Sequence, residues 1–372
     1  METMKLVLPF NEEMTAIRRY IHQHPELSNE EFETTKLIRE KLTEYGIEIA
    51  EIGLKTGVPG ILRGKKPGKT VAIREDIDAL PMPELTELPF ASEIPNVCHS
   101  CGHDIHTTVL LYCARVLSQI RDELAGTVMF LFQPAGAKQF IDCDFTRAAK
   151  PDVFIGLHVS PEYDAGTIAL KKGPVCASND FFHIKISGKG GHGAHPENFV
   201  DPVMISAYVL TQLQTIVSRE NHPISSAVLT IGNIQGGKAA NIVPDFVEKQ
   251  GILRTLTPEL RESMKQSVER IVTLGAETLR GKGEITWGDG MPPLVNDDTV
   301  IDLVAAAAEK TIGADRIFTF DSPSLGSEDF SCLFPEYAPG AQFRLGSGNS
   351  DPNTRHGIHN SKNTFEEDCI AA

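Results

Sequence analysis

A change in hydrophobic periodicity near residue 180 constrains the fold of this chain more than any other feature of its sequence. Before that point, short runs that read as strands alternate with segments in which apolar residues recur at helical spacing. The strand-like runs are 58–63, 70–75, 127–133 and 152–159, and the helical segments are 11–46, which His24-Pro25 interrupts, and 104–120. Strands alternating with helices predict an α/β domain whose central sheet is buried on both faces.

After residue 180 the order of elements changes. Residues 181–188 alternate as a half-buried strand does; they are followed by a helix at 201–218, strands at 226–234 and 246–256, a helix at 258–280 and a strand near 284–287. This order, βαββαβ, is that of a ferredoxin-like split βαβ sandwich. From about 290 the chain returns to a helix at 298–312 and a strand at 341–346. We therefore predict a discontinuous large domain, 1–180 and 290–372, with a small domain inserted at 181–289.

Composition and charge narrow the classes of partner. The chain has 372 residues, 41% of them hydrophobic, which is ample apolar material for two domains. Its formal net charge of -15 makes nucleic acid and anionic membrane surfaces poor partners and favours a small-molecule substrate. No run approaches the ~18 apolar residues of a membrane span. The N-terminal segment lacks a signal-peptide pattern and the seven cysteines are scattered, so we expect a cytoplasmic protein with reduced thiols.

A dense group of metal-binding side chains stands between residues 99 and 106. The run His99-Ser-Cys101-Gly-His103-Asp104-Ile-His106 offers a thiol and three imidazoles within eight residues. Thiolate and imidazole suit zinc, nickel, cobalt or manganese, and Gly102 lets the backbone bend so that Cys101 and His103 face one point. The alternative is a turn with a buried cysteine and surface histidines. The density of donors beside a strand end favours a divalent metal site.

Three further residues are ambiguous when each is read alone. Asp78 follows the strand 70–75, where a carboxylate either caps a turn or orients a ligating imidazole. His158 lies inside the apolar run FIGLHV, so it is either a core residue or a ligand. His359, near the C-terminal end of the sequence, is equally ambiguous.

The inserted segment carries candidate substrate-binding residues. His192 stands among glycines in GKGGHG, which has neither the Rossmann spacing nor a Walker Lys-Ser/Thr pair, so phosphate binding is disfavoured. A histidine on such a loop is suited to stabilising a developing oxyanion. Asn241 and Arg254 either bind a substrate carboxylate, for which Arg offers a bidentate fork, or are an ordinary turn Asn and surface Arg.

Taken together, these motifs resemble the metal-dependent amidohydrolases of the aminoacylase type. This group includes hippurate hydrolase, N-acetyldiaminopimelate deacetylase and the plant hydrolases that release indole-acetic acid from amino-acid conjugates. The resemblance runs nearly end to end. The motifs that carry it are RRYIHQHPELSNEEFETT (18–35), LKTGVPGILRGKKPG (54–68), REDIDALPM (74–82), CHSCGHDIHTT (98–108), LFQPA (131–135), GLHV (156–159), GKGGHGAHP (188–196), GGKAANIVPD (236–245), LRT (253–255) and GSEDF (326–330).

The resemblance implies a fold, a reaction and a site. It implies an α/β large domain with a central mixed sheet that holds two divalent metal ions per subunit, with a ferredoxin-like domain inserted for homodimerisation. The implied ligands are Cys101, His103, His158 and His359, with Asp78 and His192 counted among the catalytic residues. His192 would reach the partner's active site, and Asn241 with Arg254 would hold the substrate carboxylate. The implied reaction is hydrolysis of the amide bond of an N-acyl amino acid, with dipeptide hydrolysis as an alternative.

One departure from the family pattern concerns the general acid/base. Members usually carry two glutamates after FQPA, the first moving the proton and the second ligating metal. Here Phe132-Gln-Pro-Ala135 runs directly into Gly136, so both glutamates and about three further residues are absent after Ala135. Either the native protein has a loop that this sequence lacks, which the matching motifs on both sides favour, or the deletion is genuine and the chain binds without turnover.

Overall fold

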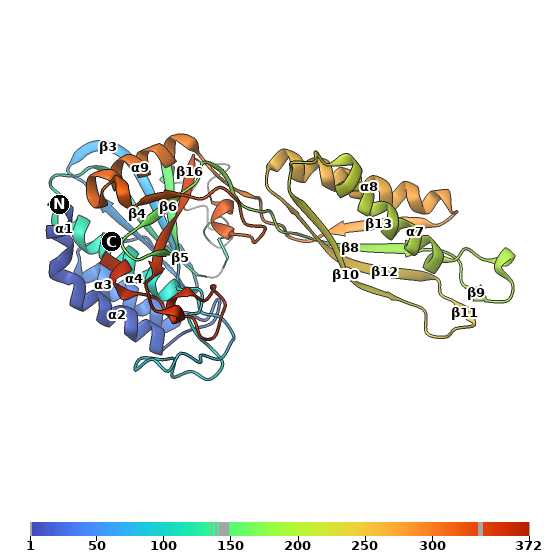
Figure 1. The fold of residues 1–372 in the computed structure, drawn as a ribbon, viewed down its shortest axis with the longest axis horizontal. Helices are drawn as coiled ribbons and strands as arrows, with labels where there is room; N and C mark the ends of the chain where they lie inside the picture. Colours follow the sequence, from blue (N-terminus) through green and yellow to red (C-terminus); the bar gives the residue numbers. More distant parts are fainter. Residues whose placement is uncertain (1, 135, 138–139, 141–148, 334–337, 372) are drawn as a thin grey trace. The chain divides into compact units, whose positions relative to one another are not determined.

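The computed structural model describes residues 2–134, 136–137, 140, 149–333 and 338–371. The chain forms two compact units: a large unit of Met1–Gly173, Asn296–Asp321 and Cys332–Ala372, and a small unit of Pro174–Val295 and Ser322–Ser331. Figure 1 gives the elements of each unit and the labels used below. The assignment of catalysis to 1–180 with 290–372, and of dimerisation to 181–289, stays a prediction.

The large unit is built on one mixed sheet with the order β1-β2-β4-β3-β5-β16-β6-β15. Its strands are β1 (Glu48–Ile49), β2 (Val58–Arg63), β3 (Lys66–Asp76), β4 (Ala125–Gln133), β5 (Val153–Asp164), β6 (Ile168–Leu170), β15 (Ile317–Thr319) and β16 (Gly340–Gly348). The strands β4, β3, β5 and β16 are parallel to one another, whereas β2 and β6 run antiparallel to their neighbours β4 and β16. The predicted α/β class with a central mixed sheet is confirmed.

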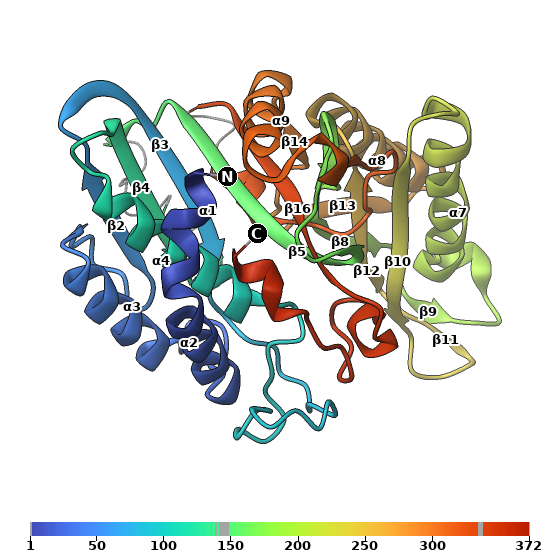
Figure 2. The same ribbon diagram turned by 60° about the vertical axis from the view of Figure 1, so that its left-hand side comes forward.

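The large unit also contains helices, some of which contact this sheet while others pack on neighbouring helices. They are α1 (Glu2–Val7), α2 (Asn11–Gln23), α3 (Phe32–Glu44), α4 (His103–Gln119) and α9 (Asp298–Ile312), with short 3-10 helices at Leu8–Phe10, Ala314–Arg316, Pro352–Arg355 and Glu367–Ala371. The helical pattern at 11–46 is two helices that part at His24, as the His24-Pro25 interruption allows. The α4 helix contacts β3, β4 and β5 and is buried along most of its length (Figure 2). Its first turn therefore meets the C-terminal ends of parallel strands, where α/β sheets place their sites.

The small unit is a four-stranded antiparallel sheet with two helices. Its order is β10-β12-β8-β13, from the strands β8 (Asp180–Ser187), β10 (Ala227–Gly236), β12 (Phe246–Thr255) and β13 (Lys282–Trp287), and its helices are α7 (Pro202–Thr215), which continues into a π-helical turn at Ile216–Glu220, and α8 (Pro258–Thr278). Both helices pack on one face of the sheet through a single apolar cluster that includes Ile184, Val209 and Val268. The predicted βαββαβ arrangement is confirmed.

Shorter pairs complete the small unit and its ends. The strands β9 (Gly191–His192) and β11 (Ile242–Val243) form a two-stranded sheet, as do β7 (Gly173–Cys176) and β14 (Leu294–Asn296). Short 3-10 helices lie at Pro196–Asn198 and Asp329–Cys332. Among the described residues, no helix combines the length and the apolar character that crossing a membrane requires.

Candidate metal centre

The four residues predicted as metal ligands meet around the thiol of Cys101. Its Sγ atom lies 3.4 Å from Nε2 of His158 and 3.3 Å from Nε2 of His359. Ligand atoms of Cys101, His103 and His158 lie within 4.8 Å of one another, and all three residues are buried. The donors come from the start of α4, from β5 and from the segment after β16, so the fold gathers residues that are far apart in the sequence.

Gly102 gives the Cys101-Gly-His103 run its shape. Its φ of +85° is left-handed, and a Cβ atom there would lie 2.5 Å from Cγ2 of Val159 in β5. Only glycine satisfies both conditions without strain or displacement of β5. Gly102 caps α4, so His103 becomes the first residue of that helix while Cys101 stays outside it. The backbone N–H of His359 donates to the Ser100 carbonyl at 3.0 Å, which brings the C-terminal ligand to the same turn.

Hydrogen bonds from the Nδ1 atoms aim two of the imidazoles. His158 donates from Nδ1 to the Val159 carbonyl at 2.8 Å. His103 donates from Nδ1 to Asp78, at 2.8 Å to the carbonyl and 3.0 Å to Oδ1. The Asp78 carboxylate also accepts from the Ser28 hydroxyl at 2.7 Å. Each Nδ1 is therefore committed as a donor, and Nε2 is the ring atom left for ligation, which is how proteins orient ligating histidines.

The electrostatics of the cluster favour a thiolate. Burial opposes ionisation of Cys101, but the nearby His103 and His158 outweigh it and hold the pKa of the thiol well below its usual range. Burial likewise opposes charge on His103, whereas Asp76 and Cys101 raise its pKa well above the ordinary value. The hydrogen bond to Cys101 raises the pKa of His359. A buried thiolate surrounded by three imidazoles is a donor set for a borderline divalent metal, and the residues present fit such an ion.

Two buried residues beside the predicted ligands were not assigned from the sequence. Asp76, the last residue of β3, lies 2.6 Å from Nδ1 of His106 through Oδ1 and 3.4 Å from Nε2 of His103 through Oδ2. Burial opposes ionisation of Asp76, but His103 and Arg74 hold its pKa well below the usual range. The Asp76-Ile-Asp78 pair was visible in the sequence, and His106 stands one turn after His103. What the sequence did not show is which oxygen and nitrogen atoms face each other.

A buried ion-pair network supports the first turn of α4 from behind. Asp104 lies 2.8 Å from Nε of Arg18 as an ion pair and accepts a hydrogen bond from Nδ1 of His22, also at 2.8 Å. The other ring nitrogen of His22 lies 3.1 Å from Glu84. Arg18 and His22 belong to the RRYIHQHP motif, and Asp104 belongs to the metal-binding run, so this network links the two motifs. The sequence of the motif does not identify Asp104 as the partner of Arg18.

The predicted substrate-binding residues belong to the small unit. His192 is exposed in β9 and pairs with Ile242 of β11, and the Gly193 N–H donates to the Asn241 carbonyl at 2.9 Å, so His192 and Asn241 are neighbours. Arg254 lies in β12 and is half-buried. Its Nη1 atom is buried without a hydrogen-bond partner among the described residues, and burial lowers its pKa. A guanidinium with a buried, unsatisfied donor is suited to a carboxylate ligand.

The predicted position of the glutamate pair, directly after Ala135, lies outside the described residues. On the side of β4, Gln133 accepts from Nε of Arg74 at 2.9 Å. The Arg74 guanidinium also lies 3.4 Å from Asp76, so the end of β4 is tied to the metal centre through β3.

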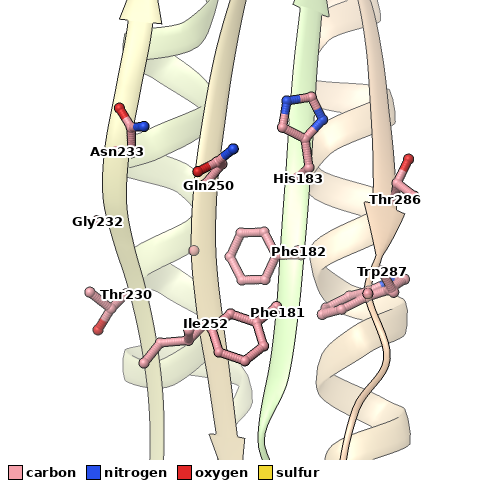
Figure 3. Close-up of a pocket in the computed structure, with 12 residues that line it drawn as sticks. Phe181, Phe182, His183, Thr230, Gly232, Asn233, Gln250, Ile252, Thr286 and Trp287 are labelled. Atoms are coloured by element: carbon pink, nitrogen blue, oxygen red, sulfur yellow. The ribbon is translucent and has the colours of Figure 1, made fainter. Parts of the chain in front are cut away.

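A hollow in the small unit is lined by residues of β8, β10, β12 and β13 (Figure 3). It has a volume of about 550 Å³, and Phe181, Phe182 and Trp287 supply much of its lining. Of the groups that could hold a metal ion in the described part of the chain, none lies here. The candidate metal-binding groups of the described residues therefore lie around Cys101 and Asp76 in the large unit.

Comparison with known proteins adds independent information about this centre. The model of peptidase family M20/M25/M40 matches residues 72–372. The N-acetyl-L-cysteine deacetylase of Bacillus subtilis is 40% identical over 364 residues, which cover 96% of this chain and 85% of that protein. Thermostable carboxypeptidase 1 of Saccharolobus solfataricus is 38% identical over 363 residues, covering 95% of this chain and 91% of that protein.

A solved structure is similar over both units. The crystal structure of a dinuclear metal-binding peptidase of the M20 family from Bacillus subtilis has a TM-score of 0.83 and is 34% identical, covering 97% of this chain and 94% of that chain.

Proposed function

The chain belongs to peptidase family M20/M25/M40, and on that premise we propose that its Cys101 centre performs the hydrolysis of N-acyl amino acids. The resemblance to amidohydrolases and deacetylases that the motifs indicate is confirmed. The chain is a hydrolase that cleaves the amide bond between an acyl group and an amino acid. The single observation that carries the assignment to Cys101 is the convergence of its thiol with the Nε2 atoms of His158 and His359.

Family membership and the dinuclear similar structure point to divalent metal. We propose two ions per subunit, drawn from zinc, manganese, nickel and cobalt, with Cys101, His103, His158 and His359 as ligands. Divalent metal supplies activation of a water molecule near neutral pH and polarisation of the amide carbonyl. The residues of the chain supply orientation: Asp78 and the Val159 carbonyl hold the His103 and His158 rings with Nε2 toward Cys101.

The substrate carboxylate is assigned to the small unit. The unsatisfied Nη1 of Arg254 supports a role in pairing with that carboxylate, with Asn241 as a further donor. His192, exposed on its short strand, donates to the oxyanion that forms when water attacks the amide carbonyl. We propose that this His192 comes from the partner in a homodimer formed through the small unit.

The sequence after β4 bears on proton transfer. It reads Gln133-Pro134-Ala135-Gly136, without the glutamate that family members use to carry a proton to the leaving amine. General acid/base help is worth roughly 10²–10⁴-fold in rate. This observation favours a second candidate function, a homologue that binds metal and N-acyl amino acids without turnover.

Two further features bear on the cellular location of the protein and on its alternative substrates. Cys98, Cys101, Cys113 and Cys369 are thiols rather than disulfides, which supports a reducing compartment and a cytoplasmic location. The 38% identity to a carboxypeptidase favours peptide bonds as alternative substrates, because a C-terminal carboxylate is common to peptides and N-acyl amino acids.

The deciding experiment incubates the metal-free protein with Zn²⁺ or Mn²⁺ and offers N-acetyl amino acids and dipeptides in parallel. We expect release of the free amino acid from N-acetyl substrates, dependent on added metal and on Cys101. Turnover of dipeptides alone would replace the proposed substrate class with the peptidase alternative. Tight metal binding and N-acyl amino acid binding without turnover would establish the second candidate.

A further inference from the structure

His106 has no role in the reaction as described so far, yet it is the most fully engaged side chain of the centre. Its side chain is completely buried. Its ring stacks on that of His103, with centroids 5.2 Å apart, and meets that of His158 edge-on at 4.7 Å. It also belongs, with Asp76 and His103, to a group of side chains whose spacing would suit a metal ion. His106 is therefore either a ligand or a residue that places the ligands.

The hydrogen bonds of His106 decide between these roles. The Val159 backbone N–H donates to Nε2 at 3.0 Å. An N–H group can only donate, so Nε2 must present its lone pair to Val159. The proton of the neutral ring is then on Nδ1, which donates to Asp76 Oδ1 at 2.6 Å. Both nitrogens are used, and neither retains a lone pair for a metal.

The partners of His106 belong to the elements that carry the ligands. Asp76 ends β3, and its second oxygen faces His103 Nε2 at 3.4 Å. Val159 follows the ligand His158 in β5, and its own carbonyl accepts from that residue's Nδ1. His106 itself lies in the first turn of α4, three residues after His103. One imidazole thus joins α4, β3 and β5 at the point where their ligands converge.

We propose that His106 is a positioning residue, not a ligand, which fixes β3 and β5 relative to α4 so that the metal-binding atoms meet. This inference rests on the proposed ligand set of Cys101, His103, His158 and His359. Removing the His106 imidazole leaves those ligands in the chain but lets Asp76 and the β5 backbone shift. Loss of groups that orient ligands typically weakens metal affinity by 10–100-fold.

The test measures Zn²⁺ and Mn²⁺ affinity by chelator competition on the metal-free full-length protein. His106→Leu removes both hydrogen bonds, whereas His106→Gln can donate to Asp76 through its amide N–H and accept from Val159 through its carbonyl. The matched control is Thr108→Val. Thr108 is equally buried on α4, and its hydroxyl donates only within the helix, to the Asp104 carbonyl at 2.7 Å.

We expect His106→Leu to bind metal at least tenfold more weakly, while His106→Gln and Thr108→Val stay close to wild type. Wild-type affinity in His106→Leu would overturn the inference, as would equal weakening in His106→Leu and His106→Gln. If the wild type itself binds no metal, the proposed metal centre is wrong. If the wild type and His106→Leu bind metal with equal affinity, the metal centre stands and only the role of His106 is wrong.

A second measurement observes the His106 ring of the wild type directly and uses only His106→Gln, the variant expected to keep both hydrogen bonds, for assignment. In wild-type protein labelled with ¹⁵N-histidine, the His106 resonances are assigned from their loss in His106→Gln. We expect protonated Nδ1 and unprotonated Nε2, unchanged when Zn²⁺ is added. A proton on Nε2, or a shift of either ring nitrogen to the values of a metal-bound imidazole, would make His106 a ligand and overturn the inference.

Discussion

Cys101 shows how strongly neighbouring charges, rather than exposure, set the chemistry of single residues in this molecule. The thiol is buried, which by itself favours the protonated form, and yet its pKa is held low by His103 and His158. The same two imidazoles keep Nε2 directed at the sulfur because their Nδ1 atoms are committed to Asp78 and Val159. The site is thus arranged to receive a cation before one arrives.

Replacing Cys101 by alanine should remove one metal ion while leaving the fold nearly intact. The reason is that Cys101 lies outside α4, so the change removes one sulfur atom without altering the hydrogen bonds of that helix. Metal content measured by mass spectrometry after dialysis, together with the thermal unfolding midpoint, checks both parts. Full metal content or full activity in Cys101→Ala would remove this residue from the ligand set.

Candidate metal ligands could be assigned from the sequence where several donor side chains stand close together, and could not where a donor stands alone. Cys101 and His103 were visible because they stand within one short run. His158 in an apolar strand, and His359 alone, stayed ambiguous between core residue and ligand until the family resemblance favoured them as ligands. Asp76 and His106 were missed as partners because their pairing depends on how far β3 and α4 approach each other, which no local pattern records.

Burial of Lys249 in β12 lowers the stability of the small unit. Lys249 lies on the helix-facing side of β12, only 1% exposed, and donates to the Ser206 carbonyl of α7. Burial lowers its pKa to about 8. The unfolded chain binds the Lys249 proton more tightly than the folded chain does. Below pH 8 the burial of the charged Lys249 therefore lowers the free energy of unfolding of the wild type in full. Part of that loss is recovered as pH rises from about 8 toward the ordinary lysine pKa.

Lys249→Met should therefore stabilise the small unit at pH 7, by about 1–2 kcal/mol, less than the pKa difference alone would give because the Ser206 hydrogen bond is lost. The advantage of the variant over wild type should narrow as pH rises from about 8 toward 10. Calorimetric unfolding of both proteins across this range measures it. A stability difference that is constant with pH would show that Lys249 is not the group responsible.

The loop after β4 gives a prediction at the same scale. Inserting Glu-Glu between Ala135 and Gly136 should raise kcat/KM for N-acetyl amino acids by roughly 10²–10⁴-fold, because it supplies the missing proton carrier. Insertion of Gln-Gln, which has the same length without the acids, is the control. Equal rates in both insertions and in the original chain would mean that the protein moves the proton by other means.

Elements were predictable from periodicity wherever they were long. The helices α7, α8 and α9 and the four strands of the small unit were all expected within a few residues of their observed positions. Short pieces such as β1, β9 and β11, with two residues each, were not, because two residues establish no period and their pairing is decided by distant partners.

At the scale of the whole molecule, the predicted contribution of His192 from a partner makes the assembly itself testable. His192→Ala and Cys101→Ala should each be nearly inactive, for different reasons. In a mixed dimer, the subunit with an intact metal centre receives His192 from its partner. Random mixing of the two variants should restore about a quarter of the wild-type sites, since half of the dimers are mixed and each has one complete site.

The readout is activity after the two variants are dissociated and reassembled together, compared with each variant treated alone. Complete absence of recovery, in a sample where mass spectrometry shows mixed dimers, would place His192 at the active site of its own subunit or outside it altogether.

The dispersal of the ligands along the chain also has a consequence in time. His158 and His359 are separated by roughly 200 residues, which a ribosome adds in about 10–40 s. During that interval the emerging chain already contains Cys101, His103 and His158, but His359, the last of the proposed ligands, does not yet exist, and neither does the Ser100 contact that places it. With the proposed ligand set, the complete metal site therefore forms only at the end of synthesis.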